Sequence, residues 1–123
     1  MKKYYKIVRN IRGRYYSYIM WLDQNGVACR EYFVDEFTTP PELAVKLGYL
    51  LTCFKSKKYA LGWMGRAGEL WEVAVNGELK KEKDLPDMGD PHMLKPWNHT
   101  LRNSGWPPGT IMVEKIKLIR RVK

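Results

Sequence analysis

Residues 47–65, LGYLLTCFKSKKYALGWMG, decide the fold that this sequence predicts. The stretch opens with a compact apolar run that ends at Phe54. A run this short is typical of a strand that is covered on both faces. Ser56 follows, and its hydroxyl can cap the first turn of a helix. The stretch therefore predicts a buried strand that leads directly into a helix.

The helix expected next has an aromatic face. Tyr59 and Trp63 repeat at the spacing of one helical face, and Ala60 and Met64 lie beside them. Gly65 is a natural place for the helix to end. A buried strand followed by a short aromatic helix predicts a small α+β domain that is organised around this pair.

The composition is that of one globular domain. The chain has 123 residues, of which 45 % are hydrophobic and 28 % charged, and this balance excludes a disordered protein. A chain of this length hides roughly two-thirds of its unfolded surface when it folds. Aromatic residues reach 13 %, with eight Tyr and five Trp. Because Tyr and Trp carry polar groups, we expect many of them half-buried in sheet faces or at a recognition surface.

Three strands are expected before the central stretch. They cover Tyr4–Arg9, Arg14–Leu22 and Val27–Val34, which are rich in residues that favour strands. A turn at residues 10–13 would join the first two strands. The Asn25–Gly26 pair, the strongest hairpin signal in the sequence, would join the second to the third. The first third of the chain therefore predicts an antiparallel meander.

Further strands are expected after the central stretch. Glu69–Val75 has one apolar face, and Asn76–Gly77 is a second hairpin signal that would turn the chain back into Glu78–Lys83. The charge of the returning segment marks it as an edge strand. Residues 84–109 form a long Pro-rich loop, and loops of this length are usually functional or disordered. Thr110–Val122 is expected to close the chain as a long strand.

Together these segments predict an α+β fold in a single domain over residues 1–123. We expect a mostly antiparallel, twisted sheet of about six strands with one short helix packed against it. The sequence contains no internal repeat and no low-complexity segment.

The clearest global signal is the formal charge of +9. Such a charge attracts polyanions or acidic protein surfaces, but it can equally serve only to keep a small Tyr- and Trp-rich domain in solution. The cations are concentrated in the first hairpin and the last strand. If those strands are neighbours, their side chains form one basic face that is interleaved with tyrosines. The residues of that face are Lys2, Lys3, Lys6, Arg9, Arg12, Arg14, Lys115, Lys117, Arg120, Arg121 and Lys123, with Tyr4, Tyr5, Tyr15 and Tyr16.

Nucleic-acid binding needs cations for phosphates and flat rings that stack on unpaired bases, and the expected basic face offers both. No helix-turn-helix, zinc-finger or RNA-recognition signature is present. The expected partner is therefore an acidic host protein or a nucleic acid. The candidate binding residues are Lys6, Arg9, Arg12, Arg14, Tyr15, Tyr16, Lys115, Lys117, Arg121, Trp97 and Trp106.

No residue pattern supports catalysis or metal binding. The segment DLPDMGDPH over residues 84–92 is rich in oxygen ligands, but its spacing is not that of an EF-hand and no closing Glu follows. His92 and His99 have no nucleophile at a readable spacing, and we interpret His99 as an anchor of the loop. Glu69 and Glu72 fall on opposite faces of a strand, so we expect Glu72 to pair with Lys or Arg. No phosphate-binding glycine loop occurs, and we expect no cofactor and no metal.

Localisation signals are few. Cys29 and Cys53 match no metal or redox spacing and are expected to behave as small apolar residues. The N-terminal segment is basic but lacks the apolar core of a secretory signal. No segment approaches the roughly 18 apolar residues that a membrane span needs. These features predict a soluble cytoplasmic protein with reduced thiols and no membrane partner.

The chain resembles small, mostly uncharacterised proteins that are encoded by bacteriophages and prophages. The resemblance rests on the short N-terminal hairpin, the pattern L-L-x-x-F-x-S-x-x-x-A over residues 50–60, a W-E-V strand at 71–73 and P-G-T at 108–110 before a basic last strand. Some members of that group resemble ADP-ribosyltransferase domains. This sequence lacks their E-x-E carboxylate pair and their S-T-S strand, so the resemblance implies little catalysis. Arg14 and Glu72 are the residues that such an NAD site would use.

Three functions are consistent with these observations. The first is a non-enzymatic binding protein, such as a phage accessory factor, that engages an acidic host protein or nucleic acid through its Lys-, Arg- and Tyr-rich face. The second is a single-stranded nucleic-acid-binding protein in which Tyr15 and Tyr16 stack on bases. The third is a divergent, NAD-using relative of the ADP-ribosyltransferases.

Overall fold

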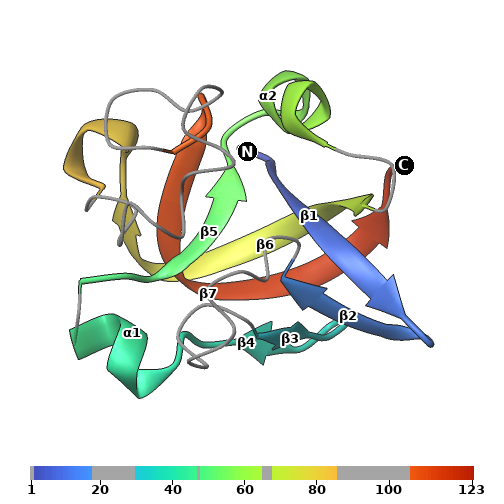
Figure 1. Ribbon diagram of the computed structural model, residues 1–123, viewed down its shortest axis with the longest axis horizontal. Coiled ribbons are helices and arrows are strands. Elements are labelled where there is room, and N and C mark those ends of the chain that lie inside the picture. Colours follow the sequence, from blue (N-terminus) through green and yellow to red (C-terminus); the bar gives the residue numbers. More distant parts are fainter. Residues whose placement is uncertain (1, 18–29, 47, 65–67, 86–105) are drawn as a thin grey trace, which may run out of the picture.

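Two long antiparallel strands, β6 (Gly68–Lys80) and β7 (Thr110–Arg121), form the centre of this fold. The computed structural model describes residues 2–17, 30–46, 48–64, 68–85 and 106–123 of the chain. Its strands are β1 (Tyr4–Ile11), β2 (Arg14–Ser17), β3 (Glu31–Tyr32), β4 (Phe37–Thr38), β5 (Leu51–Phe54), β6 (Gly68–Lys80) and β7 (Thr110–Arg121) (Figure 1). Its helices are α1 (Glu42–Lys46), α2 (Lys57–Trp63) and the short 3-10 helix η2 (Glu82–Asp84).

β6 is the centre of the sheet. β1 pairs with one part of β6 and β7 pairs along it, both in antiparallel register. β5 pairs with both β1 and β7, so β1, β6, β7 and β5 close into a four-stranded ring. β2 and β3 extend the sheet from β1, and β4 pairs with β7. The predicted mostly antiparallel sheet with few helices is confirmed, and its closure is a feature that the sequence did not indicate.

The inner face of the ring holds the main core. Because side chains alternate across each strand, every second residue points inward. Val8 from β1, Trp71 from β6, and Ile116 and Leu118 from β7 are buried there together. Tyr32 from β3 is buried in the same cluster. The ring therefore has a packed interior.

The capped helix predicted after the central strand is present as α2. The Ser56 hydroxyl accepts a hydrogen bond from the backbone N–H of Tyr59 at 3.4 Å, as an N-cap does. Ala60 is completely buried and packs with Ile7 and Leu70 on the outer side of β1 and β6. Ala60, and not the exposed Tyr59, is thus the centre of the helix face that contacts the sheet.

The apolar run before α2 divides into two parts. β5 begins only at Leu51, and residues 48–50 form the exit from α1. Gly48 has φ +88°, and the Tyr49 N–H donates to the Ala44 carbonyl at 2.8 Å. These contacts satisfy the end of α1, as glycine-terminated helix ends do. The strand predicted over residues 47–54 is therefore correct only in its second half.

Asn76 and Gly77 form a bulge instead of the predicted hairpin. β6 continues through this pair and stays paired with β7, so no separate strand returns over residues 78–83. Between Asn76 and Leu79 the register shifts, because β6 has one residue more than β7. Gly77 has φ +80°. An Asn–Gly pair can supply positive φ for a hairpin or for a bulge. Here β7 continues past the pair, so β6 stays paired with it and the extra residue forms a bulge.

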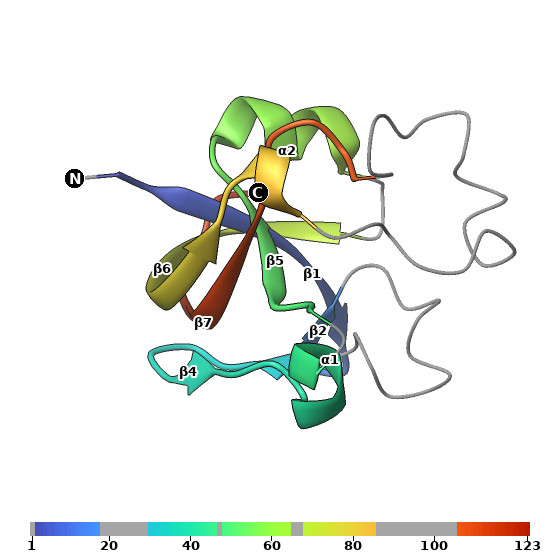
Figure 2. The ribbon, with the colours of Figure 1, turned by 90° about the vertical axis from the view of Figure 1, so that its left-hand side faces the viewer.

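The first hairpin and the last strand match their predictions. The turn between β1 and β2 contains Gly13 with φ +84°, and the Gly13 N–H donates to the Asn10 side-chain oxygen at 2.9 Å. β7 covers nearly the whole segment predicted as the closing strand. α1 and α2 lie at opposite ends of the molecule in both views (Figures 1 and 2). None of the described helices is long and apolar enough to cross a membrane.

Several predictions concern residues outside the described part of the chain. The second strand is seen only from Arg14 to Ser17, and the third only from residue 30 onward. The other predicted features that lie outside the described residues are the Asn25–Gly26 hairpin, Cys29, Gly65, Asp87, Asp90, His92, Trp97 and His99.

Candidate anion-binding surfaces

The first and last strands are not neighbours, which corrects the expected single basic face. β6 lies between β1 and β7 on one side of the ring and β5 lies between them on the other. The carboxylate of Glu72 on β6 pairs with Lys3 at 3.6 Å and with Arg120 at 3.2 Å. The two chain ends thus do converge, but they converge on a carboxylate. The expected ion pair of Glu72 with Lys or Arg is confirmed.

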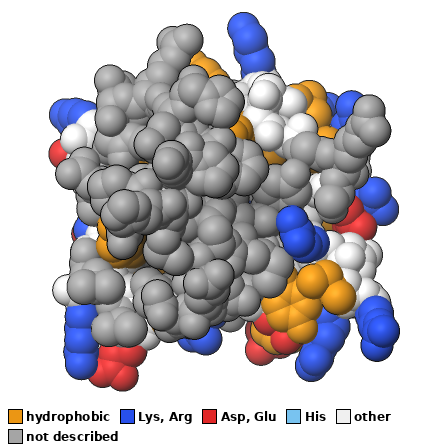
Figure 3. Space-filling model, viewed as in Figure 1, with side chains coloured by type: hydrophobic (Ala, Val, Ile, Leu, Met, Phe, Trp, Pro, Cys, Tyr) orange, Lys and Arg blue, Asp and Glu red, His pale blue; other side chains and the backbone are white. Residues whose placement is uncertain are grey.

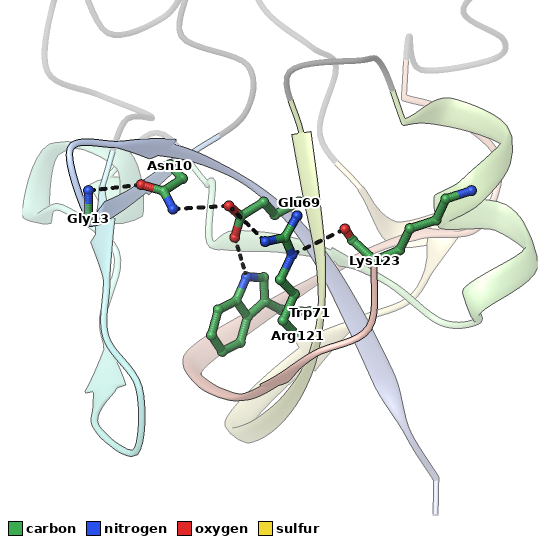
Figure 4. A network of polar contacts seen from close by, with 6 residues as sticks. All are labelled: Asn10, Gly13, Glu69, Trp71, Arg121 and Lys123. Carbon is green, nitrogen blue, oxygen red and sulfur yellow. Dashed lines mark hydrogen bonds and ion pairs between the residues drawn. The ribbon is translucent and has the colours of Figure 1, made fainter.

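Glu69 joins the same two strands on the other face of β6 (Figure 4). One oxygen of its buried carboxylate accepts a hydrogen bond from Asn10 at 3.0 Å, and the other accepts one from the Trp71 indole at 3.1 Å. Arg121 from β7 forms an ion pair with this carboxylate at 3.6 Å. The Asn10 side-chain oxygen also accepts a hydrogen bond from the Gly13 N–H, so the network runs from the first hairpin to the last strand.

A second bulge separates the cations of β7. Glu72 is opposite Arg120 but Val73 is opposite Leu118, which leaves Ile119 as an extra residue on β7. A single extra residue reverses the alternation of faces. Arg121 is therefore opposite Trp71, on the inner side, and it does not share a face with Lys115 and Lys117 as simple alternation predicts. These three predicted site residues are not brought together.

Lys6 and Trp106 serve the fold instead of an exposed contact surface. Only 6 % of Lys6 is exposed, and its ammonium donates to the Thr52 carbonyl oxygen at 2.6 Å and to the Thr52 hydroxyl at 3.1 Å. The same ammonium lies 5.0 Å from the centre of the Tyr32 ring. Trp106 is buried in a cluster with Leu85 and Met112. Both residues are thus removed from any contact surface.

The tyrosines of the expected face are divided between the two sides of the sheet. Tyr15 points inward and packs edge-to-face on Trp71, with ring centroids 5.0 Å apart. Tyr4 also packs on the inner core, whereas Tyr5 packs on the cluster beneath α2. Tyr16 alternates with Tyr15 and lies on the outer face. Tyr15 cannot serve as a stacking platform in this arrangement.

Lys115 and Lys117 lie half-buried on the outer side of β7. The Lys117 ammonium is 4.8 Å from the centre of the Phe37 ring on β4. In the view of Figure 3, Lys and Arg side chains stand around the rim of the molecule, several with Asp or Glu beside them. Among the described residues, the cations that this view shows are therefore dispersed and do not gather on one patch.

The outer face of the β1–β2 hairpin brings together the largest remaining set of predicted residues. Arg9 lies directly opposite Tyr16, and Ile11 lies opposite Arg14, so these four side chains share one face. Arg12 is in the turn itself, with φ +54°. We name Arg9, Arg12, Arg14 and Tyr16 the hairpin face.

A second basic surface was missed by the sequence analysis. Lys55, Lys57 and Lys58 are exposed around the start of α2, and Tyr59 beside them is 40 % exposed. The Lys55 ammonium is 5.3 Å from the centre of the Tyr59 ring. We name these four residues the α2 surface. The signal that could have revealed it is the run of residues 43–68, which contains no Asp or Glu.

Neither a reactive thiol nor a metal centre is found in the described part of the chain. Burial raises the pKa of the Cys53 thiol to about 12, although the nearby Lys6 charge acts in the opposite direction. A thiol with such a pKa stays protonated and is a poor nucleophile at neutral pH. The described residues contain no group of three or more His, Cys, Asp or Glu side chains that could hold a metal ion.

Comparison with known proteins assigns no relative. No protein-family model matches the chain, and no curated protein and no solved structure matches it. A functional proposal for this chain therefore depends on the chemistry of its own surfaces.

Proposed function

We propose that this chain is a small basic binding protein without catalytic activity that engages an acidic partner through the hairpin face. The observation that supports this proposal best is the position of Tyr16. Arg9 lies directly across from it on β1, and Arg14 lies two residues before it on the same face of β2. An aromatic residue that shares a strand face with two arginines offers apolar contact area beside positive charge.

The charge balance of the hairpin face favours an anionic partner. It carries three Arg, and Glu31, opposite Tyr16, is the described carboxylate that lies beside them. Glu31 pairs with Arg14 at 3.3 Å, and the Arg14 side chain is 68 % exposed. An exposed ion pair of this kind contributes only about 0–1 kcal/mol, so a carboxylate or phosphate of a partner can replace Glu31 at little cost.

The hairpin face is also held in place before any partner binds. The turn at its tip is fixed by the hydrogen bond from Gly13 to Asn10, and Asn10 is in turn bound to the buried Glu69 (Figure 4). Because the turn is already ordered, less conformational entropy is lost on binding. This support makes the hairpin a better contact surface than a free basic segment would be.

The resemblance to phage-encoded proteins leads us to propose the role of a phage accessory factor with an acidic host partner. The NAD-using alternative receives less support. Arg14 pairs with Glu31, and Glu72 pairs with Lys3 and Arg120, so the two residues that it requires have other partners. That alternative predicts that NAD raises the melting temperature of the protein, and an unchanged temperature would exclude a tight site.

The proposal is tested with a fluorescent poly-glutamate peptide and a fluorescent oligothymidylate as model acidic partners. Binding is followed by fluorescence anisotropy for the wild type, for the double variant Arg12→Gln/Arg14→Gln and for Lys46→Gln. Lys46 on α1 is an exposed cation far from the hairpin and is the matched control (Figure 1). We expect the double variant to bind at least one probe about fivefold or more weakly, because two contacts of roughly 0.5 kcal/mol each are lost.

Two results would contradict the proposal. One is a wild-type protein that binds neither probe at low salt. The other is a loss of affinity in Lys46→Gln as large as that in the double variant, which would indicate attraction by net charge alone.

A further inference from the structure

We propose that the α2 surface is a second anion-binding surface and that the ligand it fits is a single-stranded nucleic acid. The inference goes beyond the proposed function, which needs only the hairpin face. It rests on three observations: the lysines there have no acidic partner among the described residues, Tyr59 is held exposed among them, and the Gly109 turn that supports the ring is hydrogen-bonded on both sides.

No described carboxylate is paired with the α2 surface, in contrast to the cations around Glu31, Glu69 and Glu72. Lys3, Arg14, Lys46, Arg120 and Arg121 each form an ion pair within the described chain. The three lysines of the α2 surface form none with any described residue. Residues 43–68 supply no Asp or Glu that could neutralise them. Their charge is therefore directed to solvent or to a partner.

Gly109 fixes the position of the Tyr59 ring. A Cβ at Gly109 would lie 2.3 Å from Cγ of Tyr59, so the ring lies directly against this backbone. The Gly109 N–H donates to the Glu82 carboxylate at 2.6 Å, and its carbonyl accepts the Lys55 N–H at 2.9 Å. The ring thus rests on a turn that is bonded on both sides.

A single-stranded nucleic acid fits this combination better than an acidic peptide does. Proteins that bind single strands place aromatic rings beside a positively charged surface, so that bases stack while cations contact phosphates. An acidic peptide would use the lysines but would gain nothing specific from the ring. In this proposal the lysine side chains make the phosphate contacts, and the Ser56 hydroxyl already accepts the Tyr59 N–H.

Two acidic residues lie in η2 at this end of the molecule, and Glu82 is already engaged. Glu82 in η2 accepts the Gly109 N–H and is flanked by the exposed Lys81 and Lys83. Figures 1 and 2 both place η2 and α2 at the end of the molecule opposite α1. Asp84 in η2 is also exposed, so Glu82 and Asp84 balance these two lysines and the positive charge of this end comes from the α2 surface.

The test compares a fluorescent oligothymidylate, the same length of duplex DNA and a poly-glutamate peptide. Fluorescence anisotropy is measured from about 50 to 200 mM salt for the wild type, Lys57→Gln/Lys58→Gln, Tyr59→Leu and Tyr59→Phe, with Arg12→Gln/Arg14→Gln alongside. Three phosphate contacts give a slope of log K against log salt of about −2, and each lysine removed lowers its magnitude by about 0.7. We expect Tyr59→Leu to weaken oligothymidylate binding about fivefold or more and Tyr59→Phe to bind as the wild type does, since stacking needs only the ring.

The outcomes separate this inference from the proposed function. Equal oligothymidylate binding by wild type and the lysine double variant would overturn the inference, while a loss in Arg12→Gln/Arg14→Gln would still support the hairpin face. Equal binding by wild type and Tyr59→Leu, or a preference for the duplex or the peptide, would overturn the single-strand assignment. Melting curves of each variant distinguish loss of binding from loss of folding, and Tyr59→Phe retains the ring if Tyr59→Leu does not fold.

Discussion

The two most basic regions of the described chain use their cations in opposite ways. Where β1 and β7 flank β6, Glu69 and Glu72 pair with Arg121, Arg120 and Lys3, and the cations hold strands together. On the α2 surface no described carboxylate is within ion-pairing distance of the three lysines. A formal charge of +9 therefore says little about where an anion would bind. The position of the acidic residues is more informative than the number of basic ones.

The largest effect is expected where the α2 surface is supported. Gly109→Ala should lower the free energy of unfolding by about 2–4 kcal/mol, because a side chain at positive φ is strained and its Cβ would overlap the Tyr59 ring. Gly109 has φ +82°, and the overlap would include the Cβ of Tyr59 at 2.5 Å, an atom that cannot move without moving α2. Urea unfolding followed by circular dichroism measures the change.

Gly77→Ala is the matched control for this prediction. Its φ of +80° is nearly the same, but the overlap with the Glu114 side chain is milder: the carboxylate end can move aside, and the Glu114 Cβ lies at 2.8 Å against 2.5 Å for the Tyr59 Cβ at Gly109. We expect a smaller loss of about 1–2 kcal/mol, which comes mainly from backbone strain. Equal losses in the two variants would show that the Tyr59 ring is not fixed against Gly109.

The next effect concerns the region where the cations are structural. Glu69→Gln should lower the free energy of unfolding by about 1–3 kcal/mol, because an amide nitrogen would face donors from Asn10 and Arg121 in a buried site. Lys58→Gln on the α2 surface should change it by no more than about 0.5 kcal/mol, as is usual for exposed side chains. If both substitutions had the same effect, the contrast between a structural and a free set of cations would be wrong.

Local features of this fold could be predicted from sequence because neighbouring residues determine them. Ser56 followed by the Tyr59 N–H is a helix cap that depends on four consecutive residues. The turn at Gly13 and the long strand β7 follow from similarly local patterns. Pairing partners depend on the whole sheet and not on neighbouring residues. Local patterns therefore could not show that β6 lies between the first and last strands, or that β5 closes the ring.

The candidate site was harder to predict because two bulges change which side chains share a face. Ile119 is an extra residue on β7, and it moves Arg121 to the side opposite Lys117. The bulge at Asn76 and Gly77 keeps β6 paired where the sequence indicates a hairpin. Each bulge is one residue in one strand, and simple alternation carries no sign of it. The α2 surface, in contrast, was visible in the sequence as the run of residues 43–68 without Asp or Glu.

Lys6 is a cation used entirely within the fold, in the interior of the ring. The Cys53 thiol near it makes the free energy of unfolding depend on pH, and this dependence tests whether that interior is buried. Burial raises the pKa of Cys53 to about 12 from the model-compound value of 9.0, and the charge of Lys6 opposes this shift. The unfolded thiol therefore loses its proton first, and the native state is favoured fully below pH 9 and progressively less between pH 9 and 12. We expect this group to remove about 1 kcal/mol between pH 9 and 10.

The Cys53 contribution is isolated by comparing the pH dependence of unfolding in the wild type and in Cys53→Ala. Below pH 9 the variant should be less stable, because the substitution leaves a small cavity, but above pH 9 its stability should fall less steeply and the difference should shrink. Parallel curves for the two proteins would mean that the thiol is not buried in a proton-retaining site. A free thiol that reacts with Ellman's reagent in the folded protein at position 53 would lead to the same conclusion.

The smallest expected effect is the one that tests the comparison most directly. Arg120→Gln removes a charge as exposed as those of the α2 surface, with 62 % of its side chain accessible, but one that already belongs to Glu72. We expect the slope of log K against log salt for oligothymidylate to stay unchanged in this variant, whereas Lys57→Gln should lower its magnitude by about 0.7. An equal decrease in both variants would mean that Arg120 leaves Glu72 for a phosphate when the ligand binds. In that case ion pairing in the free protein would not decide which cations take part in binding, and the hairpin face, the α2 surface and the chain ends would have to be treated as one charged surface.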